Sequence, residues 1–193
     1  LTNVYDNLPS DEMVRKDGRF FQVEARAYLS APAAAALARD HDLDLADLAR
    51  TIGKFLEVGP DSFADRARGV RFWQAVWAAL RLEERLVELE DLGAARLPSG
   101  LTPAHIEECL SDAPAEVRFH LSTGAVESFL NTVPLLHPRG FLQVQDIFVT
   151  DMDEYRQGFR GPGKLDGSVV NWVNGALLRE VGARAGYDVH FAP

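Results

Sequence analysis

The sequence predicts an α/β fold with a mostly parallel sheet and a helical insertion. Strand-like apolar runs alternate with helical patterns at both ends of the chain, an order that favours a parallel sheet covered by helices. The stretch between these ends is helical in pattern and too long to serve as one crossover connection. We therefore predict a core formed by residues 1–31 and 116–193 and a helical cap formed by residues 32–115.

Composition limits the classes of function. The 193 residues are 47% hydrophobic and 25% charged, which suits one domain, or one domain with an insertion, around a substantial core. A net charge of −9 argues against a nucleic-acid partner, because phosphate backbones require clustered cations. No apolar run approaches the ~20 residues needed to cross a bilayer, so we expect a cytoplasmic protein with no membrane partner.

Metal and thiol chemistry find little support in the sequence. Cys109 is the only cysteine, which excludes a disulfide within the chain and a cluster of thiolate metal ligands. The five histidines are scattered without paired ligand spacing. We therefore predict no metal site and interpret Cys109 as a small buried filler.

The first elements show strand-like patterns. An apolar run over 1–5 predicts a strand that ends at the turn Asp6-Asn7-Leu8-Pro9, and residues 10–12 suit a single helical turn. Residues 19–29 alternate between apolar and polar, which is typical of a half-exposed strand in an antiparallel excursion.

The middle and the C-terminal part of the chain supply the remaining predicted elements. Trp73 and Trp77 lie on an apolar helical stripe, as core residues or as the lining of a pocket. Caps, prolines and apolar spacing predict helices over 33–38, 44–58, 62–91, 103–110, 123–136 and 168–185, and strands over 117–121, 141–149 and 187–192.

Three short motifs at the two ends of the chain carry a family resemblance. They are Asn3–Pro9 (NVYDNLP), the glycine-led apolar run Gly140–Val149, and Leu177–Phe191 (LLREVGARAGYDVHF). They resemble the end of the fourth strand, the fifth strand, and the last helix and strand of class I S-adenosylmethionine-dependent methyltransferases. The closest resemblance is to the methyltransferase-like family that includes the arginine methyltransferase assisting respiratory complex I assembly.

This resemblance implies a Rossmann-like fold, S-adenosylmethionine as cofactor, and methyl transfer to a protein or small-molecule acceptor. The family's glycine-rich turn after the first strand has no counterpart here. We therefore expect a partial domain, the C-terminal half, whose cofactor-binding residues lie upstream of Leu1. The alternative is a non-catalytic assembly or interaction protein of the same fold, and a third interpretation is another α/β enzyme whose cofactor binds upstream.

Asp6 and Asn7 are the predicted catalytic residues. A carboxylate and an amide at a strand end can orient a nucleophilic N–H or O–H, and alignment contributes much to methyl transfer. The alternative is an Asx turn formed before Pro9 for local reasons. Tyr5 and Pro9 are predicted on the substrate side, where the Tyr5 ring either faces a methylsulfonium by cation–π attraction or simply packs.

The loop over 151–166 is the second predicted part of the acceptor site. Its mixed charges and glycines suit a lid over a substrate, or alternatively a solvated connection. Tyr155 would line the acceptor pocket, and Arg160 and Lys164 would bind a carboxylate or phosphate group.

Asn171, Trp172 and Asn174 complete the predicted substrate-binding set. Two amides and an indole are unusual so early in a helix. They either face a pocket at the end of the strand that begins at Phe141, or the indole packs on the sheet while the amides bind nearby backbone.

Overall fold

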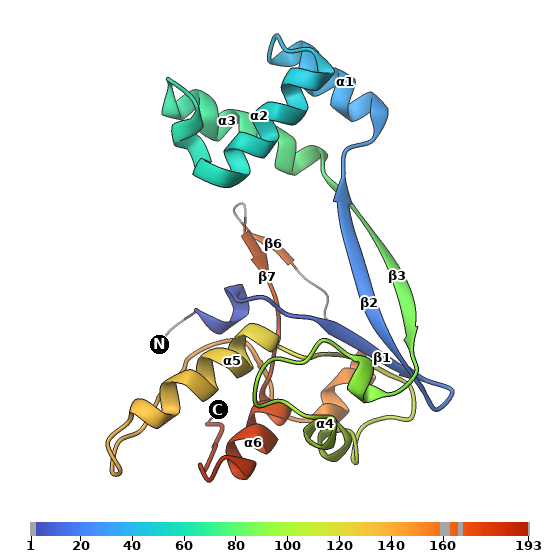
Figure 1. Cartoon of the computed structure of the whole chain (residues 1–193), viewed down its shortest axis with the longest axis vertical. Coiled ribbons are helices and arrows are strands. Elements are labelled where there is room, and N and C mark those ends of the chain that lie inside the picture. Colours follow the sequence, from blue (N-terminus) through green and yellow to red (C-terminus); the bar gives the residue numbers. More distant parts are fainter. Residues whose placement is uncertain (1–2, 159–162, 166–167, 193) are drawn as a thin grey trace. The chain divides into compact units, whose positions relative to one another are not determined.

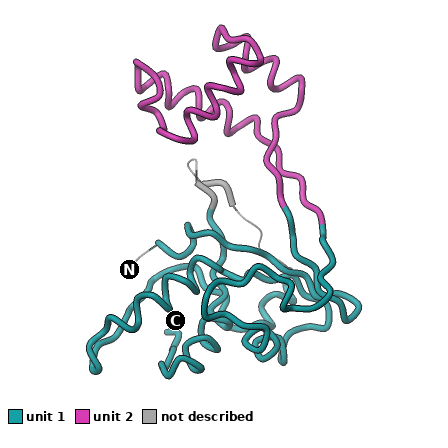
Figure 2. The backbone as a smooth tube through the Cα atoms, viewed as in Figure 1, with its two compact units in different colours: residues 1–24, 86–193 teal, residues 25–85 magenta. Residues whose placement is uncertain are grey.

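A computed structural model describes residues 3–158, 163–165 and 168–192 (Figure 1). The chain forms two compact units, unit 1 with residues 1–24 and 86–193 and unit 2 with residues 25–85 (Figure 2). The predicted cap over 32–115 overlaps unit 2 across residues 32–85. Residues 86–115 belong to unit 1, where Leu92, Leu101 and Ile106 are core residues.

The main sheet contradicts the predicted Rossmann-like parallel fold. It comprises β1 (Glu12–Lys16), β2 (Arg19–Tyr28), β3 (Arg81–Leu89) and β4 (Val117–His120) in the order β3-β2-β1-β4, and it is antiparallel. The physical reason is the two-residue connection Asp17-Gly18, with φ values of 51° and 71°. Two left-handed residues make a tight hairpin, which can join only antiparallel strands.

Among the strands that the structure describes, β5 (Phe148–Val149) and β8 (Val173–Asn174) pair in parallel. A separate antiparallel pair is formed by β6 (Gly163–Leu165) and β7 (Ser168–Val170). The helix predicted over 168–185 is shorter, because Asn174 caps α6 (Gly175–Arg184) by accepting the Leu177 N–H at 3.0 Å. The run over 187–192 is not a strand.

The prediction of one long helix over 62–91 is also wrong for its second half. α3 (Arg66–Ala79) ends at Leu80, which is extended, and β3 follows at once. Residues 81–89 (RLEERLVEL) have a helical composition, but they pair with β2 and form the cross-strand ion pairs Arg19–Glu88 and Arg26–Glu83. Tertiary pairing therefore overrides local propensity here.

Unit 1 packs helices against the antiparallel sheet and the β5–β8 pair. α4 (Pro103–Cys109) and α5 (Thr123–Thr132) both contact α6, and the predicted starts of α4 and α5 are confirmed. The core includes Met13, Phe119 and Val126. Four short 3-10 helices complete the described part of this unit: η1 (Tyr5–Asn7), η3 (Leu92–Ala94), η4 (Val133–Leu135) and η5 (Met152–Gln157). η1 begins at Tyr5, the last residue of the strand predicted over 1–5, and otherwise falls on the turn predicted over 6–9, while Asn3 and Val4 are not in a strand.

Unit 2 is a helical unit with its own core. α1 (Ala31–Asp40), α2 (Leu45–Val58), η2 (Gly59–Ser62) and α3 surround Phe72, which is fully buried. The helix predicted over 44–58 is confirmed, with Asp44 as its N-cap. Trp73 stacks on Phe55 with ring centroids 4.8 Å apart, so its ring belongs to a core stripe.

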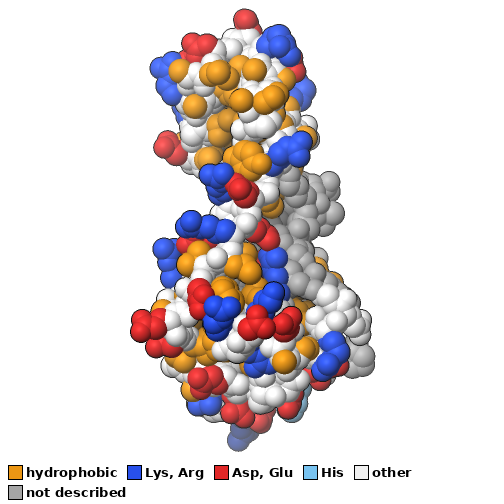
Figure 3. Space-filling model, turned by 90° about the vertical axis from the view of Figure 1, so that its right-hand side faces the viewer, with side chains coloured by type: hydrophobic (Ala, Val, Ile, Leu, Met, Phe, Trp, Pro, Cys, Tyr) orange, Lys and Arg blue, Asp and Glu red, His pale blue; other side chains and the backbone are white. Residues whose placement is uncertain are grey.

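The surface of unit 2 carries several apolar side chains. Leu45, Leu56 and Val58 on α2 are 59%, 68% and 54% exposed. Hydrophobic side chains are visible over the helices of this unit in Figure 3. No helix within the described ranges has both the length and the apolar character required to span a membrane.

Candidate functional site

The predicted catalytic residues lie on the η1 turn. Asp6 is 5% exposed, and its Oδ1 accepts a hydrogen bond from Asn7 Nδ2 at 2.7 Å. No hydrogen bond to its Oδ2 is seen among the described residues. The Asn7 side chain therefore fixes one oxygen of the Asp6 carboxylate.

Two remote segments fasten this turn. The Asn171 N–H donates to the Asp6 carbonyl at 2.8 Å, and the Asn3 N–H donates to the Gln145 carbonyl at 2.9 Å. Asp146 Oδ2 accepts the Tyr5 N–H at 2.8 Å. The structure thus places the Asp6 turn beside the segment that leads into β5 and the segment that leads into β8.

Pro9 holds the other end of the turn. Its carbonyl accepts the Gly124 N–H at 2.7 Å and the Thr123 hydroxyl at 3.2 Å, both at the start of α5. A side chain at position 124 would lie 2.8 Å from Leu8 Cβ, so glycine is required for this close approach. The role that the structure gives Pro9 is to attach the turn to α5.

Tyr5 packs into the core of unit 1 and is 3% exposed. Burial raises the pKa of its hydroxyl, whose oxygen is buried without a hydrogen-bond partner among the described residues. The packing alternative therefore describes Tyr5 better than a ring presented to a ligand.

Tyr155 and Asn174 lie in the interior around His120. The Tyr155 hydroxyl and His120 Nδ1 are 3.1 Å apart, while Asn174 Nδ2 donates to the His120 carbonyl at 2.8 Å. Burial raises the pKa of Tyr155; burial, with a smaller contribution from Arg118, lowers the pKa of His120 to about 4. These polar atoms brace β4, η5, β8 and α6 against one another.

The first part of the predicted lid is anchored. η5 begins with a capping box in which Glu154 Oε1 accepts the Asp151 N–H at 3.2 Å, and Met152 is buried. Arg160 lies outside the described residues, as does the side chain of Lys164, whose backbone belongs to β6.

Trp172 is partly buried against the unit 1 core. Its neighbour Asn171 is half-buried and acts through its backbone N–H on Asp6. Within the predicted C-terminal trio, Asn171 contacts the Asp6 turn through this backbone hydrogen bond.

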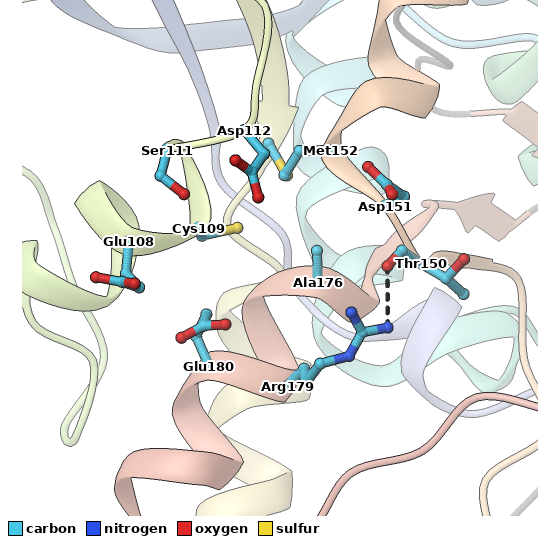
Figure 4. Close-up of a pocket in the computed structure, with 10 residues that line it drawn as sticks. All are labelled: Glu108, Cys109, Ser111, Asp112, Thr150, Asp151, Met152, Ala176, Arg179 and Glu180. Carbon is cyan, nitrogen blue, oxygen red and sulfur yellow. Dashed lines mark hydrogen bonds between the residues drawn. The ribbon is translucent and has the colours of Figure 1, made fainter.

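A hollow of about 170 Å³ lies elsewhere in unit 1, between α4, η5 and α6 (Figure 4). Its lining includes Glu108, Asp112 and Glu180, and Arg179, whose Nη2 donates to the Thr150 carbonyl at 3.2 Å. Cys109 also borders it, but burial raises the pKa of this thiol to about 12, which removes its nucleophilic thiolate form at neutral pH. None of the predicted site residues lines this hollow.

The described residues do not fit S-adenosylmethionine. The space beside the glycines at the starts of α5 and α6 is occupied by the chain itself. Leu8 and Pro9 occupy the space beside Gly124, and the Phe191 ring would lie 2.6 Å from a Cβ added at Gly175. Helix N-termini filled in this way leave no cradle for a cofactor. Across the same described residues, no three His, Cys, Asp or Glu side chains are placed to share a metal ion.

Comparisons with protein-family models, with curated proteins and with solved structures return no match for this chain. The geometry of the site therefore carries the functional argument.

Sequence reasoning missed two residues that organise this region, Asp146 and His120. Asp146 is a single carboxylate inside the apolar run 141–149, and a charge at such a position signals a specific partner. His120 ends β4 at a fully buried position, which the sequence does not reveal.

Proposed function

We propose that this chain forms the acceptor side of an S-adenosylmethionine-dependent methyl-transfer site, acting on a protein or small-molecule acceptor. The supporting observation is the fastened Asp6 turn: a nearly buried carboxylate, fixed by Asn7, held against Asn171 by a 2.8 Å backbone hydrogen bond. The resemblance of Asn3–Pro9 to the acceptor-side motif of methyltransferases points to the same residues.

Asp6 would orient the acceptor. Its Oδ2 would accept a hydrogen bond from the acceptor N–H or O–H and so fix the orientation of that group. Asn7 keeps the carboxylate from rotating, since its Nδ2 holds Oδ1 at 2.7 Å. Such alignment lowers the barrier by removing orientational freedom before the reaction, without requiring a strong base.

S-adenosylmethionine supplies the electrophilic methyl group in this class of reaction. No described residue is assigned to bind this cofactor, because Leu8, Pro9 and Phe191 occupy the space beside the glycines at the starts of α5 and α6. What the chain contributes is confined to the acceptor: a place to bind, a hydrogen-bond acceptor and a fixed orientation.

The test adds the natural gene product and methyl-tritiated S-adenosylmethionine to an extract of a strain that lacks the gene. The measured quantity is the radioactivity incorporated into protein and small-molecule fractions of the extract. The wild type is expected to label a protein or small-molecule fraction. Asp6→Asn should lower the initial rate roughly 10- to 100-fold, the range expected for a misaligned acceptor. Asp17→Asn is the matched control, because Asp17 is an exposed carboxylate in the β1–β2 turn. Absence of label with millimolar cofactor, together with no heat of binding by calorimetry, would refute the proposal.

A second candidate function is protein binding through unit 2. The observation in its favour is the exposure of Leu45, Leu56 and Val58, since large exposed apolar side chains gather at interaction surfaces. In this case the chain acts as an assembly or interaction protein and needs no methyl transfer.

Complementation of a strain lacking the gene separates the two functions. Methyl transfer predicts that Asp6→Asn fails to complement and Leu56→Asp succeeds. Protein binding predicts the reverse pattern, because Leu56 is exposed and its replacement leaves the unit 2 core intact.

A further inference from the structure

Asp146 contacts the backbone of the Asp6 turn through one oxygen. Its Oδ2 accepts the N–H groups of Val4 at 3.0 Å and Tyr5 at 2.8 Å, and the Asp6 N–H lies 3.4 Å away. Its Oδ1 accepts the N–H of Ile147 at 2.9 Å. Both carboxylate oxygens are therefore bound to backbone amides.

The N–H groups at the start of a helical turn have no partner within the turn, so they favour a negative charge. Among the described residues, Asp146 forms no ion pair, and the backbone N–H groups are the groups that offset its charge. A carboxylate bound in this way is fixed in position more firmly than a neutral acceptor, because charge-assisted hydrogen bonds are roughly twice as strong.

The surroundings of Asp146 tie it to the rest of the site. The preceding residue, Gln145, accepts the Asn3 N–H at 2.9 Å, and the following residue, Ile147, accepts the Val173 N–H at 2.9 Å. The segment 145–147 is thus hydrogen-bonded both to Asn3, which precedes η1, and to Val173, the first residue of β8. Any shift of Asp146 would move the backbone from which the Asp6 side chain projects.

We infer that Asp146 is the positioning residue of the acceptor site, which it orders by holding the backbone of Val4, Tyr5 and Asp6; the inference rests on the proposed function. Asp146 makes its contacts with the backbone, since both of its oxygens accept backbone N–H groups. It acts through Asp6.

Amide hydrogen exchange tests the hydrogen bonds between Asp146 and the η1 turn. Exchange is measured on the natural gene product for a peptide that spans residues 3–8. Asp146→Asn places an NH₂ group where one of the two oxygens accepts amide hydrogens, so exchange at these positions should rise at least about tenfold. Asp151→Asn is the matched control: Asp151 caps η5 by accepting the Asp153 N–H at 2.8 Å, and its loss should leave this peptide unchanged. Unchanged exchange in Asp146→Asn would overturn the inference.

Transfer rates test the action through Asp6. Asp146→Asn should lower the initial rate of label transfer at least about tenfold, and in the Asp6→Asn background it should cause little further loss. Equal losses in both backgrounds would show that Asp146 acts independently of Asp6 and would overturn the inference. An inactive wild type would overturn the proposed function instead, and faster exchange in Asp146→Asn would still support the placement of Asp6 by Asp146.

Discussion

Acidification should destabilise unit 1 through His120. This imidazole is fully buried, and burial together with Arg118 lowers its pKa from 6.5 to about 4. The unfolded chain therefore binds the proton more tightly than the folded chain. Stability is unaffected well above pH 6.5, falls as the pH drops from 6.5 toward 4, and loses nothing further from this group below pH 4.

The size of the effect follows from the difference between the two pKa values. Each unit corresponds to about 1.4 kcal/mol, so the full loss is about 3 kcal/mol. Between pH 7 and pH 5 the loss is roughly 2 kcal/mol. This is a substantial part of the 5–15 kcal/mol typical of a folded domain.

The assay is urea unfolding at pH 7 and pH 5, for the wild type and His120→Asn. Asparagine places a polar atom near the position of Nδ1, 3.1 Å from the Tyr155 hydroxyl, and does not titrate. The variant should lose about 2 kcal/mol less than the wild type between the two pH values. His105, whose pKa burial also lowers, is present in both proteins and cancels in the comparison.

The control is His137→Gln, because His137 is exposed. It should show the same pH dependence as the wild type. If His120→Asn also matched the wild type, the assignment of the acid sensitivity to His120 would be refuted.

Four further substitutions test the packing, each by urea unfolding. Gly124→Ala should cost about 1–3 kcal/mol, because the added Cβ meets Leu8 at 2.8 Å, whereas Gly53→Ala in α2, with open space around it, should be neutral or stabilise by up to about 1 kcal/mol. Phe72→Ala should cost about 3–5 kcal/mol, since this side chain is fully buried in the unit 2 core. Asn174→Ala should cost about 1–3 kcal/mol, because it leaves the buried His120 carbonyl and the start of α6 without their partner. A smaller loss for Phe72→Ala than for Gly124→Ala would contradict the packing described for unit 2.

Local signals predicted many elements but not the way in which strands pair. The α2 helix was predictable because Asp44 caps it and Gly59, with φ of 68°, ends it. The antiparallel sheet was predictable in principle from Asp17-Gly18, whose side-chain and backbone chemistry favours a tight hairpin. The alternation of strands and helices led instead to a parallel sheet.

Residues 81–89 show why local propensity fails. Glu, Arg and Leu favour helix in isolation, and the strand exists because β2 offers a partner with Arg19 and Arg26 opposite Glu88 and Glu83. The β2 residues that pair with β3 lie more than 50 positions away in the sequence. The sequence of β3 alone therefore does not predict the strand.

The candidate site was partly predictable. Asp6 and Asn7 were selected as polar residues at the end of a predicted strand, and Asn171 as an amide unusually early in a predicted helix. One backbone hydrogen bond joins Asp6 to Asn171 in the structure. Asp146 was not selected, because its role depends on backbone N–H groups, and these are the same in every non-proline residue. Tyr155 and Asn174 were selected for a pocket, but their burial around His120 became visible only with the fold.

The fastening of Val4 by Asp146 has a consequence for biosynthesis, because 142 positions separate the two residues. A ribosome adds roughly 5–20 residues per second, so the N-terminal turn waits roughly 7–30 s for its partner to be made. During that interval its amides are hydrated and the Asp6 carboxylate is unconstrained. Unit 2, whose contacts lie within residues 25–85, has everything it needs for its own core much earlier. The Asp6 turn therefore acquires this partner late, and a nascent chain stalled before residue 146 would carry the residues of the turn without their fixed geometry.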